Sequence, residues 1–294
     1  MQAAIPFPDI QPEIFSVTLF GFELALRWYA MGYIVGIALG YQIIRMALKR
    51  ADLWRNGPPM QVGQLEDLLT YIVIGVIAGG RLGYVFFYEP AQFLADPISI
   101  IRIWEGGLSF HGGFLGVVTA VILFSRRHAV PLPELADIIA VAATPAILLV
   151  RIANFVNAEL WGRQTDLPWG VIFPGVAAQS CATATTPCVR HPSQLYEAGL
   201  EGLLLGLILI TLAFRFGALQ KHWLLSGIFF VGYGFARFLV EFVRQPDAQF
   251  VSPGNPLGLA FHIDGIGLTM GQTLTLPMIL IGLAVMTWAA RRAR

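Results

Sequence analysis

Apolar stretches long enough to cross a lipid bilayer recur along the whole chain, and they constrain the fold more than any other feature. A membrane-spanning helix needs about 20 apolar residues. Hydrophobic residues make up 56% of the 294 positions and charged residues only 13%, which excludes an ordinary soluble protein. The sequence therefore predicts an all-α integral membrane protein, in which residues 1–294 form a single polytopic membrane domain. Its seven predicted transmembrane helices are approximately residues 26–46, 67–88, 107–125, 135–155, 197–214, 222–242 and 273–290.

Basic residues mark one side of the predicted spans. They follow the first, third, fifth and seventh spans: Arg45, Lys49, Arg50 and Arg55, then Arg126 and Arg127, then Arg215 and Lys221, and finally Arg291, Arg292 and Arg294. Loops rich in lysine and arginine stay on the cytoplasmic side. We therefore expect the N-terminus outside, the C-terminus inside, and residues 156–196 in an outer loop.

The first 25 residues precede the first predicted span. They have no basic start and no continuous apolar core, so we expect no cleavable signal peptide. Apolar residues such as Ile5, Phe7 and Phe15 are too interrupted to span the membrane. An arm that lies along the outer interface is expected instead.

Polar side chains gather at the outer level of the predicted helices. In the sixth span, spacings of four and three residues place Arg237, Glu241 and Arg244 on one helical face. Taken singly, an arginine here is equally explained as an anchor that reaches lipid headgroups. Ionisable groups are costly in hydrocarbon, however, and a set of them at one depth indicates a functional site. The other members of this set are Tyr29, Arg81, His111, Arg151 and Asn154.

The arginines indicate what this site binds. A guanidinium group is a planar fork of donors that matches the oxygens of a phosphate. The sequence therefore predicts an anionic lipid headgroup, drawn from the outer leaflet, as the ligand of Arg81, Arg151, Arg237 and Arg244.

Glycines surround His111 in residues 106–113. A glycine lets backbone or substrate approach closely, but small residues also let helices pack tightly in a membrane. The sequence leaves both interpretations open for this segment. For Gly75, Gly79 and Gly83 it favours helix packing.

Six stretches resemble motifs of the bacterial prolipoprotein diacylglyceryl transferases, and they occur in the order of that family. They are Leu26 to Tyr29, Gly79 to Tyr84, Gly106 to Gly113, Arg151 to Arg163, Arg190 to Glu197 and Glu241 to Gln249. Two departures stand out: Val150 occupies a position where the family usually has glycine, and the loop 251–266 is longer than expected.

The resemblance implies an enzyme of the bacterial cytoplasmic (inner) membrane whose active site faces the outer leaflet. Such an enzyme moves the diacylglyceryl group of phosphatidylglycerol to the lipobox cysteine thiol of a preprolipoprotein. The product is a thioether, glycerol phosphate is released, and this is the first step of lipoprotein maturation. Its partners are phosphatidylglycerol, lipobox signal peptides and membrane lipid. The net charge of +1 gives no indication of nucleic-acid binding, and we expect no cofactor or metal.

The same resemblance assigns roles to the polar residues. His111 accepts or orients the thiol proton, which an attacking thiolate must lose. Arg151 and Arg237 hold the phosphodiester and stabilise the charge that gathers on the departing phosphate. Asn154 and Tyr29 position the headgroup or glyceryl oxygens, and Glu241 orients Arg237 from one helical turn away. The remaining headgroup ligands are Arg244 and Arg81.

Two other classes of membrane protein could also carry arginines within their spans. A transporter or lipid flippase would also carry intramembrane arginines, but it should place polar groups at both depths. A scaffold that binds anionic lipid would leave His111 without a purpose. Cys181 and Cys188 in the outer loop are expected to form a disulfide rather than remain free thiols. For His191 we expect a structural role.

Overall fold

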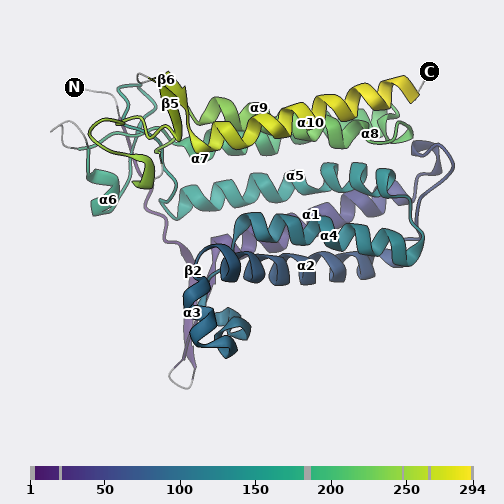
Figure 1. Ribbon diagram of the computed structural model, residues 1–294, viewed down its shortest axis with the longest axis horizontal. Coiled ribbons are helices and arrows are strands. Elements are labelled where there is room, and N and C mark those ends of the chain that lie inside the picture. Colours follow the sequence, from purple (N-terminus) through teal and green to yellow (C-terminus); the bar gives the residue numbers. More distant parts are fainter. Residues whose placement is uncertain (1–3, 20–21, 182–186, 247, 264–265, 293–294) are drawn as a thin grey trace. The chain divides into compact units, whose positions relative to one another are not determined.

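The computed structural model describes residues 4–19, 22–181, 187–246, 248–263 and 266–292, and this part of the chain is mostly helical (Figure 1). A helix coincides with every predicted span, although the bounds differ by a few residues. The fifth span is a continuous run of α7 (Ser193–Glu197), the π-helix η4 (Ala198–Leu204) and α8 (Leu205–Arg215). The helices at the other predicted spans are α1 (Trp28–Leu48), α2 (Gln64–Phe87), α4 (Phe110–His128), α5 (Leu132–Val156), α9 (Leu224–Val240) and α10 (Met270–Arg292).

Five helices of the described part are long and apolar enough to cross a membrane. They are Trp28–Leu48, Gln64–Phe87, Leu132–Val156, Ser193–Arg215 and Met270–Arg291. The apolar α9 is shorter, with 17 residues. The protein is therefore a multi-pass membrane protein.

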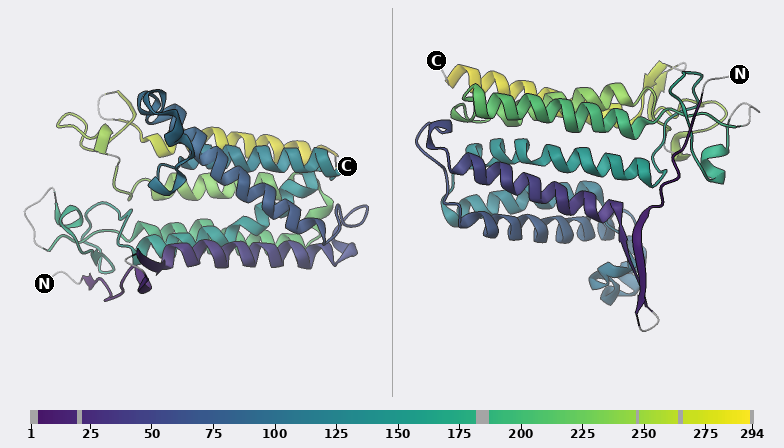
Figure 2. Two further views of the ribbon diagram at one scale, coloured as in Figure 1. Left: turned by 90° about the horizontal axis from the view of Figure 1, so that it is seen from below. Right: turned by 180° about the vertical axis from the view of Figure 1, so that it is seen from behind.

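The described residues also form three small two-stranded sheets in the connections, which the all-α expectation did not include. The strand β1 (Ile5–Pro6) pairs in parallel with β4 (Val171–Ile172). Two hairpins are antiparallel, and the first leads directly into α1 (Figure 2). These connections lack the residue pattern of a helix. The backbone N–H and C=O groups of their strands form hydrogen bonds with the paired strand instead. The hairpin strands are β2 (Glu13–Leu19) with β3 (Phe22–Arg27), and β5 (Phe261–Ile263) with β6 (Ile266–Leu268).

Short helical turns complete the connections. They are η1 (Ala51–Leu53), α3 (Pro90–Ala95), η2 (Pro97–Ile101), η3 (Ile103–Glu105), α6 (Val176–Gln179), η5 (Ala218–Gln220) and η6 (Ala248–Phe250). The chain forms two compact units, Met1–Gln42 with Ala140–Arg294, and Ile43–Ile139. The boundaries between them fall inside α1 and α5.

Glycines determine how α2 and α4 pack within the unit Ile43–Ile139. A Cβ atom on Gly83 would lie 2.7 Å from the Cα atom of Gly112, and one on Gly75 would lie 2.5 Å from the carbonyl oxygen of Gly116. Both distances are too short for any side chain, so these glycines permit the close antiparallel approach of the two helices. The packing interpretation is confirmed for Gly75, Gly79 and Gly83, and Gly112, for which the sequence left two interpretations open, packs against α2 in the same way.

Small residues have the same role in the other unit. A Cβ atom on Gly36 of α1 would lie 2.5 Å from the Cα atom of Ala146 in α5. Pro145 stands inside α5 and lacks the N–H that would bond the carbonyl of Val141. The hydroxyl of Thr144 donates to that carbonyl at 2.9 Å, so the carbonyl remains satisfied and α5 continues to Val156.

Candidate functional site

Three of the motif segments meet in the unit that contains residues 140–294. The backbone N–H of Gly162 donates to the carbonyl of His191 at 2.8 Å, and that of Arg163 donates to the carbonyl of Val243 at 2.8 Å. The hydroxyl of Ser193 donates to the carbonyl of Leu160 at 2.9 Å. These bonds join the end of α5, the start of α7 and the end of α9, and each of these helix ends supplies charged side chains.

Arg151, Arg237 and Arg244 converge on one carboxylate, that of Glu197. The Oε2 atom of Glu197 lies 3.1 Å from Nε of Arg151, and its Oε1 atom accepts from Nη1 of both Arg237 and Arg244. Glu201 adds a second carboxylate 3.8 Å from Nη2 of Arg151. We call these five residues, together with Glu241, the arginine–glutamate cluster.

Glu241 completes the cluster from the end of α9. Its Oε1 atom lies 2.6 Å from Nη2 of Arg237, which confirms the expected contact between residues one helical turn apart. The hydroxyl of Thr269 donates to the other oxygen at 2.8 Å. With both oxygens engaged, the carboxylate of Glu241 has a fixed orientation and holds the guanidinium of Arg237 in place.

The glutamate and arginine side chains of the cluster differ in how far they are exposed. Glu197 and Glu201 are almost completely buried, at 1% and 0%, whereas the side chains of Arg151, Arg237 and Arg244 remain 16–19% exposed. The two carboxylates are therefore more deeply buried than the arginines, and the guanidinium groups keep the accessible part of the cluster. Such an arrangement can receive the oxygens of an anionic group without holding unpaired cations in its absence.

Glu197 and Glu201 are the site residues that the sequence reasoning missed. The signal was present, because two carboxylates four residues apart open an apolar span, and an ionisable group inside a membrane segment is a functional candidate by default. The π-helix η4 begins directly after Glu197 and contains Glu201. Single π-helical turns occur frequently at functional sites.

Asn154 and Tyr29 belong to the surroundings of Arg151. Asn154 is 3% exposed, and its Nδ2 atom donates to Glu159 at 2.7 Å, while its Oδ1 atom is buried without a hydrogen-bond partner. The hydroxyl groups of Tyr29 and Tyr33 lie 3.4 Å apart, and Tyr29 is within electrostatic reach of Arg151 and Glu159. The free acceptor of Asn154 is suited to a hydroxyl donor of a ligand.

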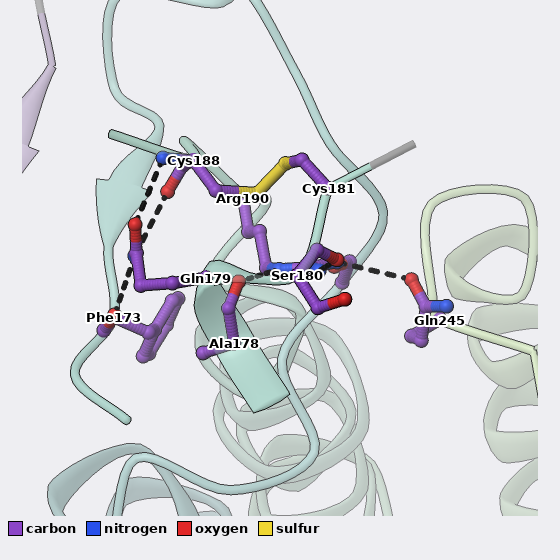
Figure 3. The surroundings of a disulfide bond; sticks show 9 residues. Phe173, Ala178, Gln179, Ser180, Cys181, Cys188, Arg190 and Gln245 are labelled. Atoms are coloured by element: carbon purple, nitrogen blue, oxygen red, sulfur yellow. Dashed lines mark hydrogen bonds between the residues drawn. A yellow bond between two sulfur atoms is a disulfide. The ribbon is translucent and has the colours of Figure 1, made fainter. Parts of the chain in front are cut away.

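A disulfide between Cys181 and Cys188 is present, as expected from the sequence (Figure 3). Next to it, the buried Arg190 donates to the carbonyls of Ala178 and Ser180 and to the side chain of Gln245 at 3.1 Å. Gln245 directly follows Arg244 of the cluster. Arg190 therefore connects the disulfide-bonded segment to the end of α9.

His191 lies beside this segment. Its Nδ1 atom is 3.2 Å from the hydroxyl oxygen of Tyr196, and burial lowers the pKa of its imidazole. Burial also lowers the pKa of Arg163 and of Arg190, although a guanidinium stays charged. The packing of His191 is in keeping with the structural role expected for it.

The remaining candidates, Arg81 and His111, lie in the unit Ile43–Ile139. Arg81 is 6% exposed, and its guanidinium donates to five backbone carbonyls. This set of bonds uses every N–H of the fork, so it favours a role in holding the connection before α4 rather than a phosphate. The five acceptors are Ser99, Ile100, Arg102, Gly106 and Gly107.

His111 is exposed in the first turn of α4. Ser109 caps this helix by accepting from the backbone N–H of Gly112 at 3.2 Å. Gly106 and Gly107 have φ angles of 88° and 78°, a conformation that favours glycine. The segment before α4 is thus folded into a fixed shape that leaves the imidazole of His111 accessible.

Comparisons with known proteins identify the family of the chain. The family model described as prolipoprotein diacylglyceryl transferase matches residues 16–288. A protein of Roseobacter denitrificans is 59% identical over 295 residues, covering 100% of this chain and 99% of the relative. One of Ruegeria pomeroyi is 58% identical with the same coverage, and one of Rhizobium meliloti is 44% identical over 293 residues, covering 99% and 95%.

All three relatives are named phosphatidylglycerol–prolipoprotein diacylglyceryl transferase. Identity at this level over almost the full length of both chains confirms the resemblance that the six motifs indicate. The chain belongs to the prolipoprotein diacylglyceryl transferase family.

Proposed function

We propose that this protein transfers the diacylglyceryl group of phosphatidylglycerol to the lipobox cysteine thiol of a preprolipoprotein, the first step of lipoprotein maturation. The sulfur forms a bond to the glyceryl carbon while the bond from that carbon to the phosphate oxygen breaks. The electron pair of the broken bond leaves with glycerol phosphate, and the thiol proton passes to a base. The products are a thioether and glycerol phosphate.

The observation that carries this proposal is the arginine–glutamate cluster. Arg151 and Arg237 hold the phosphodiester through the accessible part of their guanidinium groups, and Arg244 adds a third donor group. Negative charge on the leaving phosphate grows as the carbon–oxygen bond breaks. Guanidinium groups that are already fixed by Glu197 and Glu241 stabilise this charge without reorganising.

Two further side chains position the donor lipid. The buried Oδ1 acceptor of Asn154 receives a hydroxyl of the glycerol headgroup. The hydroxyl of Tyr29, which lies near Arg151, contacts the headgroup or glyceryl oxygens. Arg81 contributes indirectly in this proposal, because its donors hold the connection that leads to His111.

The base is His111. Its exposed imidazole lies in the first turn of α4, where it can accept or orient the proton of the incoming thiol. Replacing His111 by alanine should lower the transfer rate about 10²-fold, the lower end of what a general base contributes. The measurement is release of labelled glycerol phosphate by purified enzyme with a lipobox peptide, and the same peptide with serine for cysteine is the blank. Full activity of the His111→Ala variant contradicts the assignment of the base and leaves that of the arginines intact.

We also propose a single membrane domain with seven spans in the inner membrane, the N-terminus outside and the active site toward the outer leaflet. Its support is the position of the basic residues, which stand in the last turns of alternate spans. A helix end with its cations on the cytoplasmic side satisfies both the positive-inside rule and the helix dipole. These residues are Arg45 in α1, Arg126 and Arg127 in α4, and Arg215 in α8.

The two cysteines of the chain offer a direct test of this orientation. In intact spheroplasts, a membrane-impermeant maleimide is expected to label the protein only after a reductant has opened the disulfide. Reduction frees the two thiols, and in the proposed orientation both lie on the outer side of the membrane. A variant with serine at both positions is the control. Labelling that requires lysis of the spheroplasts would reverse the proposed orientation.

A further inference from the structure

A long groove follows the α2–α4 pair, and none of the roles assigned above uses it. Its volume is about 1010 Å³, and it is lined by Ile74, Ala78 and Leu82 of α2 and by Leu115 and Leu123 of α4. His111 lies at one end of it. All of these residues belong to the unit Ile43–Ile139.

The polarity of the groove changes along its length. At the end with His111, the lining also includes Ser109 and Tyr88. Further along, the hydroxyls of Thr119 and Thr70 donate to carbonyls of their own helices at 2.8 and 2.9 Å. Their donors are therefore already used. Apart from these side chains the lining is apolar, with Phe86 and Phe87 also near the His111 end. The groove therefore suits a hydrocarbon chain whose polar end lies beside the imidazole of His111, which is the pattern of an amphiphile such as a phospholipid.

The dimensions fit one hydrocarbon chain. The glycines shared by α2 and α4 leave the surface between the helices hollow. From His111 to Leu123 the helix rises ~18 Å at ~1.5 Å per residue. An acyl chain that reaches the middle of a hydrocarbon core ~30 Å thick extends ~15 Å. At the far end Tyr71 lines the groove, and its ring packs edge-on against Phe124 with centroids 5.6 Å apart.

We propose that this groove holds one acyl chain of the donor lipid and that its far end sets the chain length the enzyme prefers. The inference rests on the proposed function, which supplies a diacyl lipid as substrate and places the reacting thiol near His111. Surrounding lipid is as apolar as the groove, so burial alone gives little preference for either. The groove therefore selects chains by shape and length.

The test is to shorten the groove at two depths. Ile74→Trp adds bulk at an exposed lining position about halfway between His111 and Leu123, because the neighbouring Gly75 packs against Gly116, and Leu123→Trp adds bulk near the far end. Rates are measured in mixed micelles with dioctanoyl, dilauroyl and dipalmitoyl phosphatidylglycerol. We expect Ile74→Trp to keep the rate with the dioctanoyl lipid and to lose about tenfold with the dipalmitoyl lipid, which is the size of effect that a few badly fitting methylene groups produce. Leu123→Trp should disfavour only the longest chain.

Matched controls are Val73→Phe and Val118→Phe, which add bulk at exposed positions of the same helices outside the groove. They should keep the wild-type dependence on chain length. Parallel chain-length profiles in all variants, or an equal loss with every lipid, would overturn the proposal. If Ile74→Trp does not fold, the chain-length profile of Leu123→Trp decides alone. Wild-type protein that transfers no lipid of any length would instead overturn the proposed function.

Discussion

Glu197→Gln is expected to remove most of the transfer activity and to destabilise the protein. The carboxylate of Glu197 is buried and contacts Arg151, Arg237 and Arg244. Glutamine keeps the size of the side chain but leaves one positive charge of the cluster without its partner. Breaking a buried ion pair from one side costs about 3–5 kcal/mol. A displacement of catalytic groups by ~1 Å costs about 10²-fold in rate.

Thermal unfolding in detergent measures the first effect, and kcat and KM for phosphatidylglycerol measure the second at a temperature where both proteins stay folded. Glu201→Gln is the matched control, since this carboxylate is equally buried but contacts Arg151 from 3.8 Å. A smaller loss is expected there. Wild-type kinetics for Glu197→Gln would mean that the cluster does not hold the phosphate.

The sequence predicted those parts of the structure that depend on local spacing. The length of the apolar stretches located every long helix of the described residues. The interval of four residues placed Arg237 beside Glu241, which the structure confirms at 2.6 Å. Positive charge at helix ends and glycine at helix contacts also follow from short-range rules. In a membrane these rules are strict, because backbone groups have no solvent to replace a lost hydrogen bond.

Contacts between distant segments could not be predicted in this way. Glu197 is 40 residues from Arg237 and 46 residues from Arg151 along the chain, so only the tertiary fold reveals that one carboxylate organises three cations. The sequence placed only Glu241 beside the arginines of this site. The fold adds the buried carboxylates of Glu197 and Glu201, which lie within ion-pair distance of these arginines and change the electrostatics of the site.

Arg81 shows the opposite case, in which a side chain at the expected depth has another use. Its position in a span made it a candidate for the headgroup, yet its donors are taken by carbonyls of the connection between α2 and α4. That connection consists of the short helical turns α3, η2 and η3 and the segments between them, and the sequence did not predict how these turns are arranged. An irregular segment needs donors for its carbonyls, and a buried guanidinium supplies five at once.

The planar guanidinium group of Arg237 is expected to act through its shape as well as its charge. Arg237→Lys should lower kcat/KM about 10²-fold to 10³-fold, the usual effect of removing a donor that stabilises charge in the transition state. Nη1 of Arg237 contacts Glu197 and Nη2 contacts Glu241. A lysine ammonium keeps the charge, but one nitrogen cannot bridge both carboxylates and still direct hydrogen bonds to a phosphate.

Comparing Arg237→Lys with Arg237→Ala separates shape from charge. Equal losses in the two variants indicate that the fork geometry is essential, whereas rescue by lysine indicates that a point charge suffices and argues against a bidentate phosphate contact. Arg244→Lys is the matched control, because Arg244 contacts the same two carboxylates from 3.2 and 3.8 Å and its replacement should cost less. Since lysine keeps a positive charge beside Glu197 and Glu241, the Arg237→Lys variant should remain folded, and the loss should appear in the rate of glycerol phosphate release rather than in thermal stability.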